Sequence, residues 1–292
     1  MIDYEQLKRW PFRDIEQSYS EKDTILYALG VGLGHDPLDE RQLQFVYEKQ
    51  LKALPTMAVV LGYPGFWVKD RATGIDWVRV VHGEQSLKLH KPIPSAGTVI
   101  GRTRVSAIVD KGPGKGALLV QERTIHDKAS SDLLATIEQV TFCRADGGFS
   151  GRPGNGPKGG DPAPVPKPPA PDRAPDAVCE LPTLPQSALI YRLCGDLNPL
   201  HAEPAAAVAA GYPRPMLHGL CTYGVASHAV LKTYCGYEPS LLREFSLRFS
   251  APVFPGERIR TEMWRQSDRI FFRALVPERD VVVLSHGTAK LA

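Results

Sequence analysis

A short segment in the second half of the chain places an acid and an imidazole close together. Four residues separate Asp196 from His201, and Pro199 and Pro204 prevent a continuous helix through the segment. The Gly-Asp-x-Asn-Pro sequence is typical of turns, so Asp196 and His201 should flank a compact loop and face one cleft. Each residue alone would be an ordinary turn or structural residue. Together they predict general acid–base chemistry.

The loop needs helices and a sheet to hold it. We expect a short helix over 203–210, ended by Gly211, and a long one over 220–234, ended by Gly236. Runs rich in β-branched residues follow the long helix, separated by turn residues. They predict four strands, at 242–253, 258–266, 269–276 and 281–290.

The first half repeats this order. Asp39 can cap a helix over 40–54 that stops before Pro55. Four strand-like runs follow, at 78–92, 98–110, 116–126 and 133–144. One long helix packed on an antiparallel sheet in each half indicates the α+β class.

A break in composition divides the two halves. Between 147 and 175, 7 Gly and 9 Pro occupy 16 of 29 positions and large apolar residues almost vanish, so no core should form there. The segment should start flexible and end as an extended spacer. We therefore expect an N-terminal unit over 1–146, a linker over 147–175 and a C-terminal unit over 176–292.

The halves also share an internal repeat at an offset of 160 residues. Ser86-Leu87-Lys88-Leu89 matches Ser246-Leu247-Arg248-Phe249, and a proline follows each segment three residues later. Two equivalent units could pair their sheets edge to edge.

Composition excludes several classes of function. The 292 residues carry 35 Lys+Arg and 32 Asp+Glu, and this formal charge of +3 is scattered, which argues against a nucleic-acid or membrane-surface partner. The five cysteines are odd in number and lack ligand-like spacing, which disfavours disulfides and structural zinc. No apolar run reaches about 18 residues, and the acidic N-terminus lacks a signal-peptide pattern.

The segment from Tyr191 to His201, Tyr-Arg-Leu-x-Gly-Asp-x-Asn-Pro-Leu-His, resembles the hydratase 2 motif of the MaoC-like, double-hotdog 2-enoyl-CoA hydratases. Cys194 and Glu203 depart from the family's more common Ser or Thr and Asp, at positions that are not catalytic. The likeness covers both halves and extends to the segments 27–32, 82–85, 217–222 and 248–256.

This resemblance implies reversible, cofactor-free hydration of a trans-2-enoyl-CoA thioester to the (3R)-3-hydroxyacyl-CoA. Asp196 and His201 would hold one water and carry both proton transfers on one face, which leaves open which of them protonates C2. Asn198 would orient the pair. Gly219, at the start of the long helix, would offer its backbone N–H to the thioester oxygen as negative charge develops there. No metal is expected.

Other residues receive weaker assignments. The first half has no matching acid and imidazole, so it should bind the acyl tail in a tandem hotdog, with a broken or displaced helical segment after Pro55 leaving room. His82 and Gly83 belong to a family motif and receive a supporting role. Arg214 is a candidate contact for CoA phosphates, against the alternative of a solvated loop arginine. His218 is expected to be structural.

Two alternatives stay open from the sequence. A hotdog thioesterase would hydrolyse acyl-CoA, and a non-catalytic protein would only bind it. Crotonyl-CoA separates the three classes by loss of enoyl absorbance, release of free CoA, or neither. We expect a homodimer of double-hotdog chains in a bacterial cytoplasm. A peroxisomal origin stays open although the C-terminus lacks Ser-Lys-Leu.

Overall fold

Ten strands form one continuous antiparallel sheet in the computed structural model, which describes residues 2–292. Five strands come from each half, in the order β1-β3-β4-β5-β2-β7-β10-β9-β8-β6. The strands of the first half are β1 (Ile15–Tyr19), β2 (Val80–Leu89), β3 (Gly97–Asp110), β4 (Ala117–Asp127) and β5 (Leu133–Cys143). Those of the second are β6 (Ala177–Pro182), β7 (Leu242–Phe249), β8 (Arg258–Gln266), β9 (Arg269–Val276) and β10 (Val281–Leu291).

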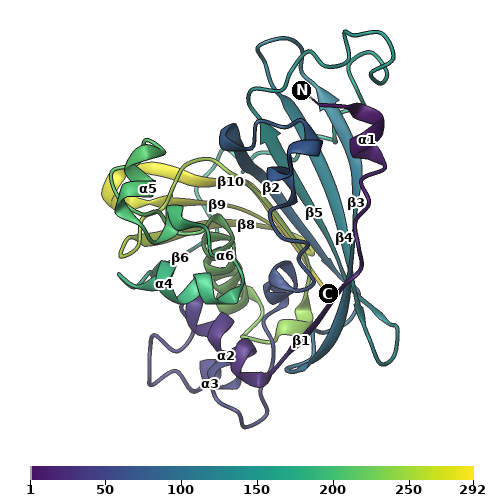
Figure 1. Cartoon of the computed structure of the whole chain (residues 1–292). Coiled ribbons are helices and arrows are strands. Elements are labelled where there is room, and N and C mark those ends of the chain that lie inside the picture. The colour runs from purple at the N-terminus through teal and green to yellow at the C-terminus, as the bar shows by residue number, and fades with distance from the viewer. Residues whose placement is uncertain (1) are drawn as a thin grey trace.

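The two halves join at the pair β2–β7. Ser86 lies opposite Ser246, which is its equivalent at the offset of 160, with Gln85 opposite Leu247 and Leu87 opposite Phe245. Counted outward from this pair, the strands of the two halves follow in the same order, β5-β4-β3-β1 on one side and β10-β9-β8-β6 on the other. The two halves are therefore related by a local twofold axis at the β2–β7 pair. In Figure 1 the yellow C-terminal strands continue into the blue and teal N-terminal ones. The expected edge-to-edge pairing is confirmed.

The second half has the expected long helix. α6 (Gly219–Tyr234) is buried at every position from Cys221 to Leu231 and packs on the apolar face of the sheet. Gly224 permits close packing, because a Cβ there would lie 2.4 Å from Cγ1 of Val31. The other α-helices are α1 (Tyr4–Lys8), α2 (Glu21–Gly30), α3 (Glu40–Val46), α4 (Ser187–Tyr191) and α5 (Pro204–Ala209). Figure 1 shows α2, α4 and α6 gathered on one side of the sheet.

The helix predicted over 40–54 is wrong in length, so only the C-terminal unit has a long helix on its sheet. α3 ends at Val46, and the chain turns back so that the N–H of Lys52 donates to the carbonyl of Gln44 at 2.7 Å. The Lys52 ammonium then pairs with Glu238 at 2.7 Å. A short 3-10 helix, η1 (Pro55–Val60), takes the place of a long helix, as the broken segment after Pro55 predicted.

The 147–175 linker makes more contacts than expected. Phe149 is fully buried, and the Asp161 carboxylate accepts hydrogen bonds from the N–H of Ile108 and the hydroxyl of Tyr4, both at 2.7 Å. Gly160 pairs with Val109 of β3 in a β-bridge. The expectation that no part of this segment joins a core is therefore wrong, because its glycines let the backbone lie directly against β3.

Three histidines make folding sensitive to acid. Burial lowers the pKa of His82, His218 and His228 from 6.5 to about 4. The unfolded chain binds these protons more readily, so the free energy of unfolding should fall as the pH drops from about 6.5 to about 4. Each group accounts for roughly 2–3 kcal/mol near the acid end of that range.

His228→Gln tests this pH dependence. The Nε2 of His228 lies 3.1 Å from the hydroxyl of Tyr237, a contact that a glutamine amide can replace. Urea denaturation of both proteins at neutral and acid pH should show a smaller loss of stability in the variant. Equal losses in the two proteins would contradict the assignment.

No helix within residues 2–292 is long and apolar enough to cross a membrane.

Candidate active site

The structure brings Asp196 and His201 together. The Nε2 of His201 lies 4.0 Å from Oδ2 of Asp196. The His201 side chain is buried, whereas that of Asp196 is 52% exposed. This spacing leaves both atoms free to contact one water molecule at a site open to solvent.

Asn198 holds the loop in two ways. Its backbone N–H donates to Oδ1 of Asp196 at 3.1 Å, and its side-chain oxygen accepts from the N–H of Leu200 at 3.0 Å. The second bond caps the 3-10 helix η6 (Pro199–His201) that carries the imidazole. Asn198 therefore contacts the carboxylate through its backbone, while its amide group shapes the turn.

The hydrogen bonds of His201 determine which ring nitrogen is free. Nδ1 lies 2.9 Å from the carbonyl of Met216 and must donate to it, so the neutral ring carries its lone pair on Nε2, toward Asp196. Burial lowers the pKa of His201, opposed by the Met216 carbonyl and the Asp196 charge. The imidazole is therefore neutral at physiological pH and can accept a proton.

His218 contacts both members of the pair. Its ring stacks on that of His201 with centroids 3.7 Å apart, and its Nε2 donates to the backbone carbonyl of Asp196 at 3.1 Å. It is also the N-cap residue of α6. We expected His218 to be structural, and through these contacts it links the loop from Asp196 to His201 with α6.

Gly219 begins α6 directly after His218. The first N–H groups of a helix have no partner within it, so the Gly219 N–H is available to an oxygen atom of a ligand. A Cβ at Gly219 would lie 3.2 Å from Cε1 of Phe249. There is therefore little space for a side chain between Gly219 and the Phe249 ring.

Phe249 is close both to His82 of the first half and to Gly219. The ring of His82 lies 4.7 Å from the ring of Phe249, edge to face. Gly83 follows on β2, where a Cβ would approach the carbonyl oxygen of Val140 to 3.2 Å. His82 and Gly219 thus both lie next to the Phe249 ring, at the end of the β2–β7 pair.

Two buried tyrosines form a row of aromatic rings with His218. The ring of Tyr191 on α4 is 5.1 Å from that of His218, and Tyr27 on α2 is 5.9 Å from Tyr191. Both are almost fully buried. The sequence assigns no role to either tyrosine, because only the fold brings α2 and α4 next to His218.

Arg214 lies outside this cluster. It is exposed on the loop before α6, with its guanidinium 5.1 Å from the centre of the Phe254 ring. The structure therefore places the Arg214 side chain at the surface.

The site fits a water molecule better than a metal ion. Ligand atoms of Asp196, His201 and His218 lie within 4.8 Å of one another. The planes of the two stacked imidazole rings are only 27° apart, however, so their in-plane lone pairs lie in two nearly parallel planes, which disfavours a shared tetrahedral metal ion.

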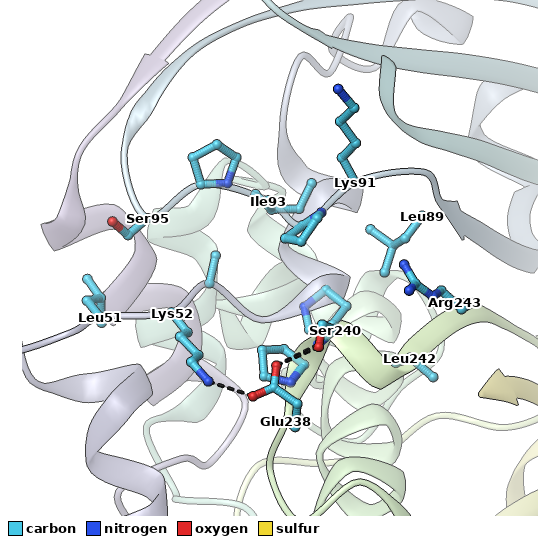
Figure 2. Close-up of a pocket in the computed structure, with 15 residues that line it drawn as sticks. Leu51, Lys52, Leu89, Lys91, Ile93, Ser95, Glu238, Ser240, Leu242 and Arg243 are labelled. Atoms are coloured by element: carbon cyan, nitrogen blue, oxygen red, sulfur yellow. Dashed lines mark hydrogen bonds and ion pairs between the residues drawn. The ribbon is translucent and has the colours of Figure 1, made fainter. Parts of the chain in front are cut away.

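A cavity of about 360 Å³ lies at the other end of the β2–β7 pair (Figure 2). Leu89 and Leu242 come from the ends of those strands, and Pro55 is the first residue of η1. Figure 2 shows the Lys52–Glu238 ion pair at its edge. None of the predicted site residues lines it, and the sequence carried no signal for it.

Comparison with known proteins places both halves in described families. Residues 17–145 match the model of the MFE-2 hydratase 2 N-terminal domain, and residues 166–286 match that of the MaoC like domain.

Relatives resemble this chain over most of its length. The peroxisomal enoyl-CoA hydratase 2 of Arabidopsis thaliana is 37% identical, over 92% of this chain and 89% of that protein. The crystal structure of a MaoC-like dehydratase from Phytophthora capsici matches 100% of this chain and 99% of its own, with a TM-score of 0.85 and 32% identity.

Full-length peroxisomal multifunctional enzyme type 2 from Drosophila melanogaster is 35% identical over 96% of this chain, with a TM-score of 0.79, and the chain spans 48% of that enzyme. A Mycobacterium tuberculosis protein with a double hotdog fold, 16% identical at a TM-score of 0.56, shares the fold alone. The chain belongs to the MaoC-like enoyl-CoA hydratase 2 family and has a double hotdog fold.

Proposed function

We propose that this protein is a hydro-lyase that adds water reversibly to trans-2-enoyl-CoA and forms (3R)-3-hydroxyacyl-CoA. The observation that carries this proposal is the free Nε2 of His201 beside the Asp196 carboxylate, next to the N-terminus of α6. Family membership supports the same reaction.

The reaction follows from this geometry. A water held between Asp196 and His201 attacks C3 of the enoyl group while Nε2 of His201 accepts one of its protons. The electron pair of the C2–C3 double bond shifts toward C1, and negative charge develops on the thioester oxygen, where the Gly219 N–H stabilises it. The Asp196–His201 pair then delivers a proton to C2, which restores the enzyme.

The N-terminal unit, over 1–146, would hold the acyl tail, with 147–175 as linker and 176–292 as the catalytic unit. The difference between η1 and α6 supports this division. In the second half α6 packs along the sheet, whereas in the first half only the short η1 does so, which leaves the sheet there less covered. His82 and Gly83 would form the wall between thioester and tail, with His82 in contact with the Phe249 ring. Arg214 would contact the CoA phosphates from the surface.

Stereochemistry gives the sharpest test of the reaction. Because one water held by one loop reaches one face of the planar enoyl group, addition should be syn and the product (3R). Crotonyl-CoA hydration coupled to a dehydrogenase specific for (3R)-3-hydroxyacyl-CoA should form NADH in step with enoyl loss, and a (3S)-specific one should form none. Predominant (3S) product would contradict the proposed orientation. Release of free CoA would indicate the thioesterase instead.

We further propose a homodimer located in the cytoplasm. Light scattering on the purified protein should give twice the chain mass of 32.1 kDa. A monomer would contradict the dimer, and a peroxisomal location, as in the name of the Arabidopsis relative, would contradict the cytoplasmic assignment.

A further inference from the structure

Polar residues divide the interior of the first half in two. Along the inner face of β4, Ala117 and Leu119 belong to one buried apolar cluster and Ile125 to another. Gln121 and Arg123 lie between them, each only 4% exposed. An ordinary hotdog sheet would be expected to present apolar residues at such positions.

The polar region extends across neighbouring strands. Gln85, Gln139 and Gln121 lie opposite one another in register on β2, β5 and β4. The indole N–H of Trp67 donates to Gln121 at 2.9 Å, so this part of the region is satisfied internally. Arg123, one inward-facing position further along β4, is different.

Arg123 carries a buried charge without a counter-ion. One of its terminal nitrogens donates to the carbonyl of Val59, the fifth residue of η1, at 2.5 Å, and its guanidinium lies 5.3 Å from the centre of the Tyr63 ring. Its Nε has no partner, and no carboxylate within residues 2–292 pairs with it. A buried guanidinium normally requires an anion, because burial removes its hydration.

The surroundings of Arg123 point to a ligand. Thr103 lies directly opposite on β3, and its buried hydroxyl also lacks a partner within the described chain. Beside Arg123, burial and then the charge of Asp196 raise the pKa of Tyr63 to about 12, so its hydroxyl is neutral and offers Arg123 no counter-ion. Arg123 stays protonated at neutral pH even though burial lowers its pKa to about 10.

We propose that Arg123 and Thr103 bind a carboxylate carried on the acyl tail of the substrate, so that the preferred enoyl-CoA thioesters bear an acid group distant from the thioester. This inference rests on the proposed tail-binding role of the first half. A carboxylate fits better than a hydroxyl group because it neutralises the guanidinium and accepts hydrogen bonds from both residues. A plain alkyl tail would leave both polar groups unpaired.

Binding of unreactive ligands tests the proposal. Saturated acyl-CoA thioesters would be compared as matched pairs, alkyl against ω-carboxy, over a series of chain lengths by isothermal titration calorimetry. At the length that reaches Arg123, wild type should bind the ω-carboxy thioester about tenfold or more tightly than its alkyl partner. Arg123→Met should abolish this preference, and Thr103→Val should reduce it.

Arg104→Met is the matched control. Arg104 lies on the neighbouring strand β3 but is exposed and paired with Glu122, so its loss should leave the preference unchanged. Turnover of crotonyl-CoA should also be the same in wild type and Arg104→Met. If Arg123→Met loses its fold, the wild-type comparison and Thr103→Val decide the question.

Wild type without a carboxylate preference at any chain length, or Arg123→Met with the preference intact, would overturn the proposal. The calorimetric result does not depend on hydration. A protein that binds the ω-carboxy thioester as expected but leaves crotonyl-CoA unchanged would therefore refute the proposed reaction and not this site.

Discussion

Asp196→Asn and His201→Gln are each expected to lower kcat for crotonyl-CoA hydration by about 10²–10⁴. Asn at 196 keeps the shape of the side chain but loses the charge beside Nε2. Gln at 201 can still donate to the Met216 carbonyl, as Nδ1 does now, but offers no basic nitrogen. Loss of enoyl absorbance measures the rate.

Both variants should retain their fold, as judged by circular dichroism and thermal unfolding, because Asp196 is half-exposed and the Gln preserves the buried contact. Asp268→Asn, at an exposed turn, controls for the loss of a carboxylate. A variant at either catalytic position that kept more than about a tenth of the wild-type kcat would remove that residue from the mechanism.

Gly219→Pro is expected to lower kcat by about 10²–10³, because it deletes the N–H proposed to stabilise the thioester oxyanion. Proline is tolerated at the first position of a helix, where the N–H has no helical partner. The preceding residue, His218, has φ −59° and ψ 135°, which suits a residue before proline.

Gly219→Ala is the matched control for this variant. It keeps the N–H and adds the same Cβ, which would lie 3.2 Å from the Phe249 ring. Steady-state kinetics on crotonyl-CoA should therefore separate the two variants, with the alanine much closer to wild type. Equal kcat values would show that crowding against Phe249, and not the N–H, accounts for the loss.

Strands in this protein follow from local patterns. The predicted runs over 258–266 and 269–276 coincide with β8 and β9. Both runs contain β-branched residues, and turn residues delimit each run at both ends. The repeat at an offset of 160 also indicated the β2–β7 pairing. By contrast, the predicted helix over 40–54 is too long. After α3 the chain turns back on Gln44, and Lys52 pairs with Glu238, which lies 186 residues away in the sequence and has no counterpart in the local pattern.

The proximity of Asp196 and His201 was predictable because both residues lie within one short motif. The surroundings of the pair were not. The stacking of His218 on His201, the contact of Phe249 with His82, and the position of Tyr63 beside Arg123 all join segments far apart in the sequence. No local residue pattern encodes such contacts, since they depend on tertiary packing, within one half for the first and third and between the halves for the second.

The difference between α6 and η1 bears on how such a chain can change over time. In a symmetric dimer of single hotdog units, both copies have the same sequence, so each substitution changes both. A substitution that shortened the long helix would therefore shorten it in both copies, and both would lose the N–H at its first residue. In this chain Ser86 and Ser246 lie opposite each other at the local twofold axis, but the two halves have different sequences. Substitutions in the first half can therefore change its helices without changing the Asp196–His201 loop of the second half.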